Sequence, residues 1–314
     1  MAKTDNVEHT SAEEVQEQLR KENEYIIKNK SVRRRSRLRT IIIILLIFLL
    51  IMAILAGVTY SLMQFVEDSN FRVSVSHTDT AVLSLSKDYN FTNPTSVLDI
   101  SAPQNMDNCT LCNYIDHKLL DIYSTDGSYK GEGTKEYFIA TSFFLKNTGR
   151  RDVNYREIIS LDRTMKGMDK AIRVMVIKDI EPPDDEAYGT ITVYAAPKSD
   201  ADGNDLTDEE GNLILEEVVP TGGTMTGYKP KTIIDYDKFE FDPADIREDG
   251  VWMTKAFQGN GYVINNQAEP PLQVNQVIKY TIVIWLEGQD EQCVDDILGG
   301  QVKLAVEFAI DETK

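Results

Sequence analysis

Cysteine residues offer the clearest potential for chemistry in this sequence. Cys109 and Cys112 form a C-x-x-C motif, and Cys293 is the third cysteine of the chain. The motif is typical of a redox pair, half of a zinc site or a small structural disulfide. A zinc site needs about four ligands, and His117 would bring the set only to three. We predict a structural disulfide, either Cys109–Cys112 or one of these residues with Cys293, with free thiols and metal or redox chemistry as the alternatives.

A second candidate is the acidic segment that starts at Asp200. Its first residues resemble the opening of a calcium loop, which carries oxygen ligands at its first, third and fifth positions. Such a loop needs glycine at position 6 and glutamate at position 12, where this chain has Asp205 and Gly211. The segment also contains an echo, D-A-D-G-N at 200–204 and D-E-E-G-N at 208–212. Because glycine and asparagine tolerate positive φ, we predict two tight turns rather than a calcium site.

The usual catalytic signatures are missing from the sequence. It contains no H-E-x-x-H, no G-x-S-x-G, no P-loop and no dinucleotide-binding G-x-G-x-x-G. We therefore expect no catalytic residue, no cofactor and no resident metal, and we expect that the protein is not an enzyme. A hydrolase that uses carboxylates or a bound metal is a minor alternative, since the chain is rich in acids.

Beyond residue 70 the pattern is typical of β-strands. Short runs rich in β-branched and aromatic residues alternate with turn residues, and long strand–helix alternation is absent. We predict an all-β fold, an antiparallel jelly-roll-like sandwich with insertions, one of them at 197–232, and a short helix at 160–170. The expected strands are 71–76, 81–86, 137–149, 171–180, 189–196, 277–288 and 301–310.

An uninterrupted apolar run covers residues 41–58 and extends to Phe65, and residues 41–65 carry no formal charge. It is long enough to cross a bilayer as a helix, and it is apolar on every face. The basic residues before the run are expected in the cytoplasm, and the acidic residues after it are expected outside. A cleaved signal peptide is the alternative, although no clean A-x-A site follows the apolar core. The topology signal consists of Arg33, Arg34, Arg35, Arg37 and Arg39.

Charge divides the chain into the same three zones. Residues 1–40 hold ten Lys or Arg against seven Asp or Glu, whereas residues 66–314 hold 23 basic and 44 acidic residues. A domain this acidic is repelled by nucleic acid, so we expect no nucleic-acid partner. We predict a cytoplasmic arm at 1–39 with a short helix over 11–30, a transmembrane helix at 40–65 and an extracytoplasmic domain at 66–314. In the arm, Glu17 and Lys21 form an expected i,i+4 pair.

Two stretches resemble surface proteins of Gram-positive bacteria related to TasA and camelysin, including uncharacterised Clostridia-type members. One is GVTYSLMQFVEDSNFRVSV at 57–75, and the other pairs FFLKNTG at 143–149 with YTIVIWLEGQDEQCVDDILGGQVKLAVEF at 280–308. The resemblance implies export and a jelly-roll-like β-sandwich. The chain differs from the group in its long basic arm and in lacking a clear cleavage site.

These observations favour a non-enzymatic, single-pass protein of the plasma membrane whose C-terminal domain is extracellular. We expect it to act as an envelope, adhesion or matrix-assembly component, with the membrane as one partner and self-association or other surface proteins as others. An alternative is an extracytoplasmic sensor or accessory subunit that signals through the N-terminal cytoplasmic helix.

Overall fold

The full chain is represented by a computed structural model in two compact units, residues 1–68 and 69–314. The helix of the first unit is described at 12–67, with its side chains at 16–28 and 41–57. In the second unit the described residues are 71–76, 82–100, 109–116, 118–129, 137–181, 189–200, 203–218, 242–259 and 261–311.

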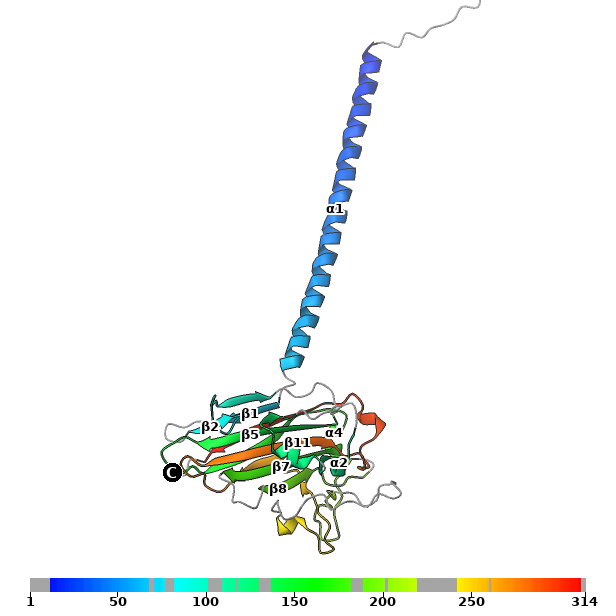
Figure 1. Cartoon of the computed structure of the whole chain (residues 1–314). Helices are drawn as coiled ribbons and strands as arrows, with labels where there is room; N and C mark the ends of the chain where they lie inside the picture. Colours follow the sequence, from blue (N-terminus) through cyan, green and yellow to red (C-terminus); the bar gives the residue numbers. More distant parts are fainter. Residues whose placement is uncertain are drawn as a thin grey trace, which may run out of the picture. The chain divides into compact units, whose positions relative to one another are not determined.

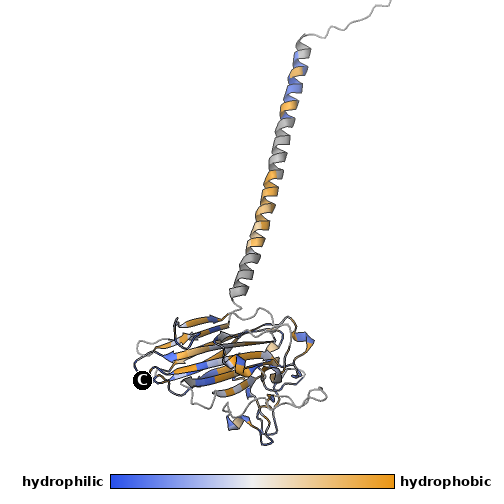
Figure 2. Ribbon diagram, viewed as in Figure 1, coloured by the Kyte–Doolittle hydropathy of each residue, from blue (hydrophilic) through white to orange (hydrophobic). Residues whose placement is uncertain are grey.

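The first unit is one continuous helix, α1 (Ala12–Glu67). The expected short helix and the apolar run therefore belong to the same element, in which no proline interrupts the backbone hydrogen bonds. The predicted i,i+4 ion pair is confirmed, with Lys21 Nζ 2.8 Å from Glu17 Oε1. Figure 2 shows the strongly apolar part of α1 at 41–57. Among the described residues, no helix is both long and apolar enough to cross a membrane.

The second unit is mostly β-sheet (Figure 1). One sheet has the order β10-β6-β12-β1-β3, and the other has the order β2-β5-β11-β7-β8-β9 with β4 paired to β5. The strands are β1 (Phe71–Val75), β2 (Leu83–Ser86), β3 (Val97–Ile100), β4 (Gly127–Ser128), β5 (Phe138–Asn147), β6 (Tyr155–Thr164), β7 (Ile172–Glu181), β8 (Thr190–Ala195), β9 (Lys255–Ala256), β10 (Tyr262–Ala268), β11 (Val277–Leu286) and β12 (Val302–Ile310). The short helices are α2 (Cys112–Asp116), α3 (Leu119–Tyr123), α4 (Met168–Ala171), η1 (Pro243–Asp245) and η2 (Asp295–Ile297).

Both sheets are mixed, so the prediction of a purely antiparallel fold is wrong. β1 lies between β12 and β3 and is parallel to β12, with Val73 opposite Val306. β8 and β9 form the second parallel pair. Period-two alternation shows which face of a strand is buried, but it carries no information on the direction of the neighbouring strand.

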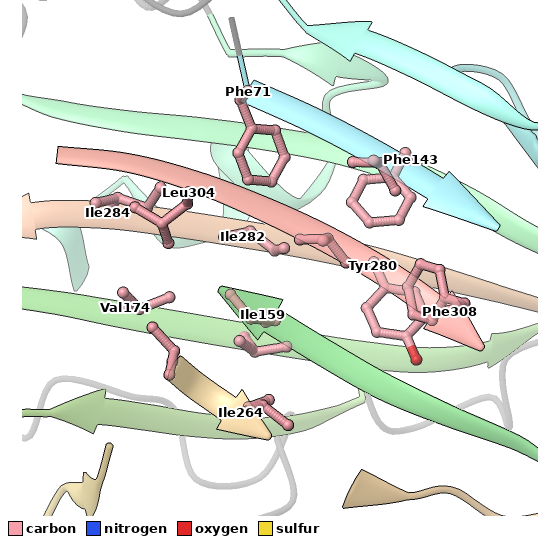
Figure 3. Packing of buried hydrophobic residues seen from close by; sticks show 14 of the residues in the cluster. Phe71, Phe143, Ile159, Val174, Ile264, Tyr280, Ile282, Ile284, Leu304 and Phe308 are labelled. Atoms are coloured by element: carbon pink, nitrogen blue, oxygen red, sulfur yellow. The ribbon is translucent and has the colours of Figure 1, made fainter. Parts of the chain in front are cut away.

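A single apolar core lies between the two sheets. Strands of both sheets contribute to it. At its centre the rings of Phe143 and Tyr280 are stacked with their centroids 5.4 Å apart, and the centroid of the Phe308 ring lies 4.9 Å from that of Tyr280. Figure 3 shows these rings together with Ile159 and Ile282. Aromatic rings bury a large apolar area each, so this contact is a major part of what holds the sheets together.

The sheet that contains β11 is also covered on its outer face. Every residue of β11 is buried, and its outward-facing side chains form a second cluster with residues of α2 and α3. Trp285 and Met175 are at 0% exposure in this cluster. A strand buried on both faces is expected to be apolar along its length, as the strand predicted at 277–288 largely is.

The seven strands predicted from the sequence are confirmed, with small changes at their ends. The helix expected at 160–170 is wrong over most of its length, because residues 155–164 form β6 and only Met168–Ala171 turn as a helix. β6 pairs with β12 and β10. Neighbouring strands thus override a local sequence in which charged residues and methionines favour a helix.

Candidate functional site

An open cavity of about 300 Å³ lies at one edge of the two sheets. Its lining combines polar and charged side chains from β7, β8, β9, the end of β10 and Asp242, the residue before η1. Threonine hydroxyls, an amide, two lysines and two carboxylates all reach the cavity. Such a mixture fits a small polar ligand better than an apolar one. The lining residues are Val176, Lys178, Thr190, Ile191, Thr192, Tyr194, Asp242, Lys255, Gln267 and Glu269.

An ion triad stands at the inner wall of this cavity. Lys178 Nζ forms a very short ion pair with Glu157 Oε2 and lies 2.8 Å from Glu269 Oε1. The side chains of Glu157 and Glu269 are 0% and 8% exposed. β6 supplies Glu157, β7 supplies Lys178, and Glu269 follows β10, so the triad joins the two sheets through charge rather than through apolar contact.

Gly189, the residue before β8, lies very close to this lysine. A Cβ atom at Gly189 would lie 2.4 Å from the carbonyl oxygen of Lys178, and Gly189 has φ of +115°. Both the contact and the backbone conformation therefore require glycine at this position. The close approach fixes the start of β8 against the end of β7.

Burial sets the charges of the triad. It raises the pKa of Glu157 to about 7, against the opposing effect of Lys178. For Lys178, burial alone would lower the pKa, but the two glutamates raise it well above its ordinary value. Burial also raises the pKa of Tyr155 and Tyr194, so both phenols stay neutral. The lysine is thus a fixed cation held between the two glutamate side chains.

A second charged group lies beside the cavity. Lys255 Nζ is 3.1 Å from Asp242 Oδ2 and 3.5 Å from Asp245 Oδ1. A hydrogen bond from the Ala244 backbone, followed by the contact with Lys255, lowers the pKa of Asp242. Both lysines at the cavity are therefore paired with carboxylates.

The outer face of the larger sheet holds a different charged cluster, which sequence reasoning missed. Arg173 Nη2 lies 2.6 Å from Asp290 Oδ2, and the two side chains are 0% and 1% exposed. Glu287 accepts hydrogen bonds from the Trp285 indole and from the Cys112 backbone, both at 3.0 Å. Burial raises the pKa of Glu287 despite these bonds. The one available signal was an acid directly after the most apolar strand, at Glu287.

All three cysteines lie at this same end of the sheet. Cys109 is exposed, Cys112 is buried at the start of α2, and Cys293 is half-buried in the loop between β11 and β12. No disulfide joins the three cysteines, all of which lie in the described part of the chain. The C-x-x-C motif therefore leads into the start of α2 beside Glu287, and Cys293 lies in the loop that follows Glu287.

The acidic echo forms two tight turns, as predicted. Asp200 Oδ1 accepts a hydrogen bond from the Asn204 backbone at 2.9 Å, and Asp208 Oδ1 accepts one from Asn212 at 2.7 Å. Gly203 and Gly211 both have positive φ. In the part of the chain that the structure describes, no group of three or more His, Cys, Asp or Glu residues is arranged to hold a metal ion.

Several of the residues singled out above lie outside what is described. His117 is among them, and so is most of the second half of the expected insertion at 197–232. The helix backbone passes through the topology signal, but the side chains of Arg33, Arg34, Arg35, Arg37 and Arg39 are not described.

Comparison with known proteins adds no relative: no family model matches the chain, and no curated protein matches it. The resemblance to the TasA and camelysin group accordingly stays a prediction from the quoted stretches.

Proposed function

We propose that this chain is a non-enzymatic cell-surface protein, anchored in the plasma membrane by the apolar part of α1. One observation carries the proposal: every large apolar side chain from Ile41 to Leu55 is between 50% and 62% exposed, on all sides of the helix. A helix that is apolar all round normally lies in a protein core or a bilayer. Since the β unit has a complete core of its own residues, lipid is the remaining environment that would bury this surface.

The proposed orientation follows from charge. The five arginines before the apolar run favour a cytoplasmic N-terminus, and the acid-rich residues that follow it favour an extracellular C-terminal domain. In this orientation, α1 links a cytoplasmic arm to an external domain within one uninterrupted helix.

For the external domain we propose a jelly-roll-like sandwich with an inserted hairpin around residues 197–232. The core shared by the two sheets supports a sandwich. The turns at 200–204 and 208–212 support the hairpin. Together with the TasA-like stretches, this favours an envelope, adhesion or matrix-assembly component that associates with itself or with other surface proteins.

The chemistry of the cavity supports a non-enzymatic role. A carboxylate pair used for hydrolysis needs one acid free to give a proton to the substrate and another free to act as base or nucleophile. Here Glu157 and Glu269 share Lys178, and Glu157 is completely buried. The arrangement is better suited to joining two sheets than to proton transfer, so a hydrolase is the weaker candidate.

The test of the anchor uses two matched double substitutions in the full chain. Leu46→Arg with Leu50→Arg places two charges in the apolar run, and each costs about 3 kcal/mol at the centre of a membrane helix. We expect this variant to move from the carbonate-resistant membrane fraction to the extractable fraction. Leu19→Arg with Ile26→Arg makes the same kind of change in the arm, where both side chains are also exposed, and should leave membrane retention unchanged. Equal retention of both variants would contradict the anchor.

The mature N-terminus decides between an anchor and a cleaved signal. An intact Met1 or Ala2 in isolated membranes is the expected result. A start within residues 57–68 would instead indicate secretion and favour assembly of free fibres.

A sensor or accessory subunit is the second candidate, and the continuity of α1 favours it. Residues of the arm and of the apolar run belong to one helix from Ala12 to Glu67. A helix without a break transmits a rotation or shift along its length, which a flexible linker would not.

A further inference from the structure

Cys109 is held against the end of β11 by backbone pairing. The next residue, Thr110, donates its N–H to Leu286 O at 2.9 Å and accepts from Gly288 N at 2.8 Å. A Cβ atom built on Gly288 would lie 3.4 Å from Cys109 Cβ. The cysteine therefore packs directly over the start of the β11–β12 loop.

The same loop folds back to bring Cys293 to this place. Asp290 N donates to Glu287 O at 3.1 Å, and Cys293 N donates to Asp290 O at 3.0 Å, so two successive turns reverse the chain. The side chains of Cys109 and Cys293 lie close enough to interact. Burial, and then the neighbouring Cys109, raise the pKa of Cys293 to about 12.

Cys112 is directed elsewhere. Its side chain is 2% exposed and belongs to the outer-face cluster with Ile115 and Trp285. Its backbone N–H is bound to Glu287 Oε2. Pairing Cys112 with either of the other cysteines would require withdrawing its side chain from this packed cluster, and the cavity left behind would destabilise the fold.

We propose that Cys109 and Cys293 form a disulfide in the mature protein and that Cys112 remains a buried thiol. The proposal rests on the extracytoplasmic location proposed above, because disulfides persist in that environment. The oxidant is the disulfide of a thiol–disulfide oxidoreductase. The thiolate of the exposed Cys109 attacks one of its sulfurs to form a mixed disulfide, and the Cys293 thiolate then displaces the oxidoreductase. The two cysteines lose two electrons and two protons, and the oxidoreductase leaves as a dithiol.

The bridge would join the segment that leads from Cys109 into α2 to the loop between β11 and β12, which supplies Asp290 of the buried ion pair with Arg173. Because the cysteines are far apart in the sequence, the bridge closes a long loop and restricts the unfolded chain strongly. Reduction should lower the melting temperature by on the order of 5–10 °C.

Mass spectrometry of the full-length chain tests the pairing. Cells are quenched in acid, free thiols are alkylated under denaturing conditions, and the chain is cut with trypsin without reduction. Cys109 and Cys112 then lie in one peptide between Lys87 and Lys118, and Cys293 lies in another between Lys279 and Lys303. We expect the two peptides to be linked, with the alkyl label on Cys112. Cys112→Ala should keep the link, whereas Cys109→Ser and Cys293→Ser should abolish it.

A Cys109–Cys112 bond, or a link made through Cys112, would overturn the proposal. A second arm treats the purified, folded full-length chain with oxidised glutathione. Free thiols in both arms would show that the two cysteines do not pair. The remaining outcome is free thiols in cells together with rapid Cys109–Cys293 pairing in glutathione. It would overturn the bridge in cells because it would overturn the extracytoplasmic location. Failure of the location is thus distinguished from failure of the pairing itself.

Discussion

Buried charges in the β unit occur in compensated groups. Arg173 is paired with Asp290 on the outer face of one sheet, and Lys178 is paired with two glutamates between the sheets. Removing such a charge from water costs several kcal/mol, which only a close partner offsets. These groups therefore fix the geometry of their surroundings more than they add to stability.

The Arg173–Asp290 pair gives a direct prediction. Arg173→Leu leaves the Asp290 carboxylate buried without its closest cation, so unfolding in urea should show a loss of about 3–5 kcal/mol. The matched control is Arg72→Leu in the pair with Asp99, whose side chains are 60% and 54% exposed. That change should cost less than about 1 kcal/mol. Similar losses in the two variants would contradict the burial of the Arg173 pair.

Glu157 should make stability depend on pH. Its pKa is raised from 4.5 to about 7 in the folded chain. Between these values the folded state binds more protons than the unfolded state, so this group makes stability fall as pH rises. Glu157→Gln should remove that fall. Between pH 4 and pH 8, the free energy of unfolding of the variant should therefore rise relative to that of the parent by up to roughly 3 kcal/mol.

The measurement is the unfolding free energy at several pH values for the full chain. Glu307→Gln is the control, because Glu307 lies on the same sheet and is exposed. If Glu157→Gln shows the same pH profile as the parent, then the pKa of Glu157 is the same in the folded and the unfolded chain, and burial does not govern its charge.

At the scale of elements, the sequence predicted those strands whose own pattern is strong. β5, β11 and β12 carry long β-branched and aromatic runs, and their positions were predicted correctly. β6 was missed because its second half, Ser160–Thr164, is polar and is held by pairing with β12. Pairing between distant strands is a tertiary property, which no local window of sequence contains.

The candidate site was hidden for the same reason. Glu157, Lys178 and Glu269 belong to three separate segments and form no motif. Only the pairing of β6 with β10, and the packing of that sheet on β7, bring the three together. By contrast, the acidic turns at 200–204 and 208–212 were predictable, because an aspartate caps a turn only a few residues away.

The parallel pairing of β1 with β12 is open to a test by hydrogen exchange. β12 lies between β6 and β1, so its amides should be protected over Ala305–Phe308, where both neighbours pair with it, including those directed at β1. β3 is the last strand of the same sheet, and its outward amides should exchange quickly. Fast exchange at alternate residues of β12 would show that β1 does not pair there.

At the scale of the whole molecule, the two units divide the proposed work. The β unit has its own core and ion groups, whereas α1 carries the exposed apolar surface and the basic flank. Anchoring needs only the apolar run and the arginines, but signalling would also need the arm that precedes them. The anchor and sensor proposals therefore differ in the role of residues 1–32.

Deleting residues 2–32 while keeping the five arginines separates these roles. We expect the shortened chain to stay in the membrane with its β unit outside, because the positive flank and the apolar run are both retained. Protease added to intact cells should then digest the β unit of the deletion variant as it does that of the parent.

The counterpart is to replace the arginines of the topology signal by glutamine, at Arg33, Arg34, Arg35, Arg37 and Arg39. This change should reduce the correctly oriented fraction several-fold, since the charge bias is lost. If cytoplasmic proteins co-purify with the parent but not with the deletion variant, that result would support the sensor proposal. If the deletion alone prevents insertion, then the arm itself is part of the anchor, and the topology does not rest on the arginines.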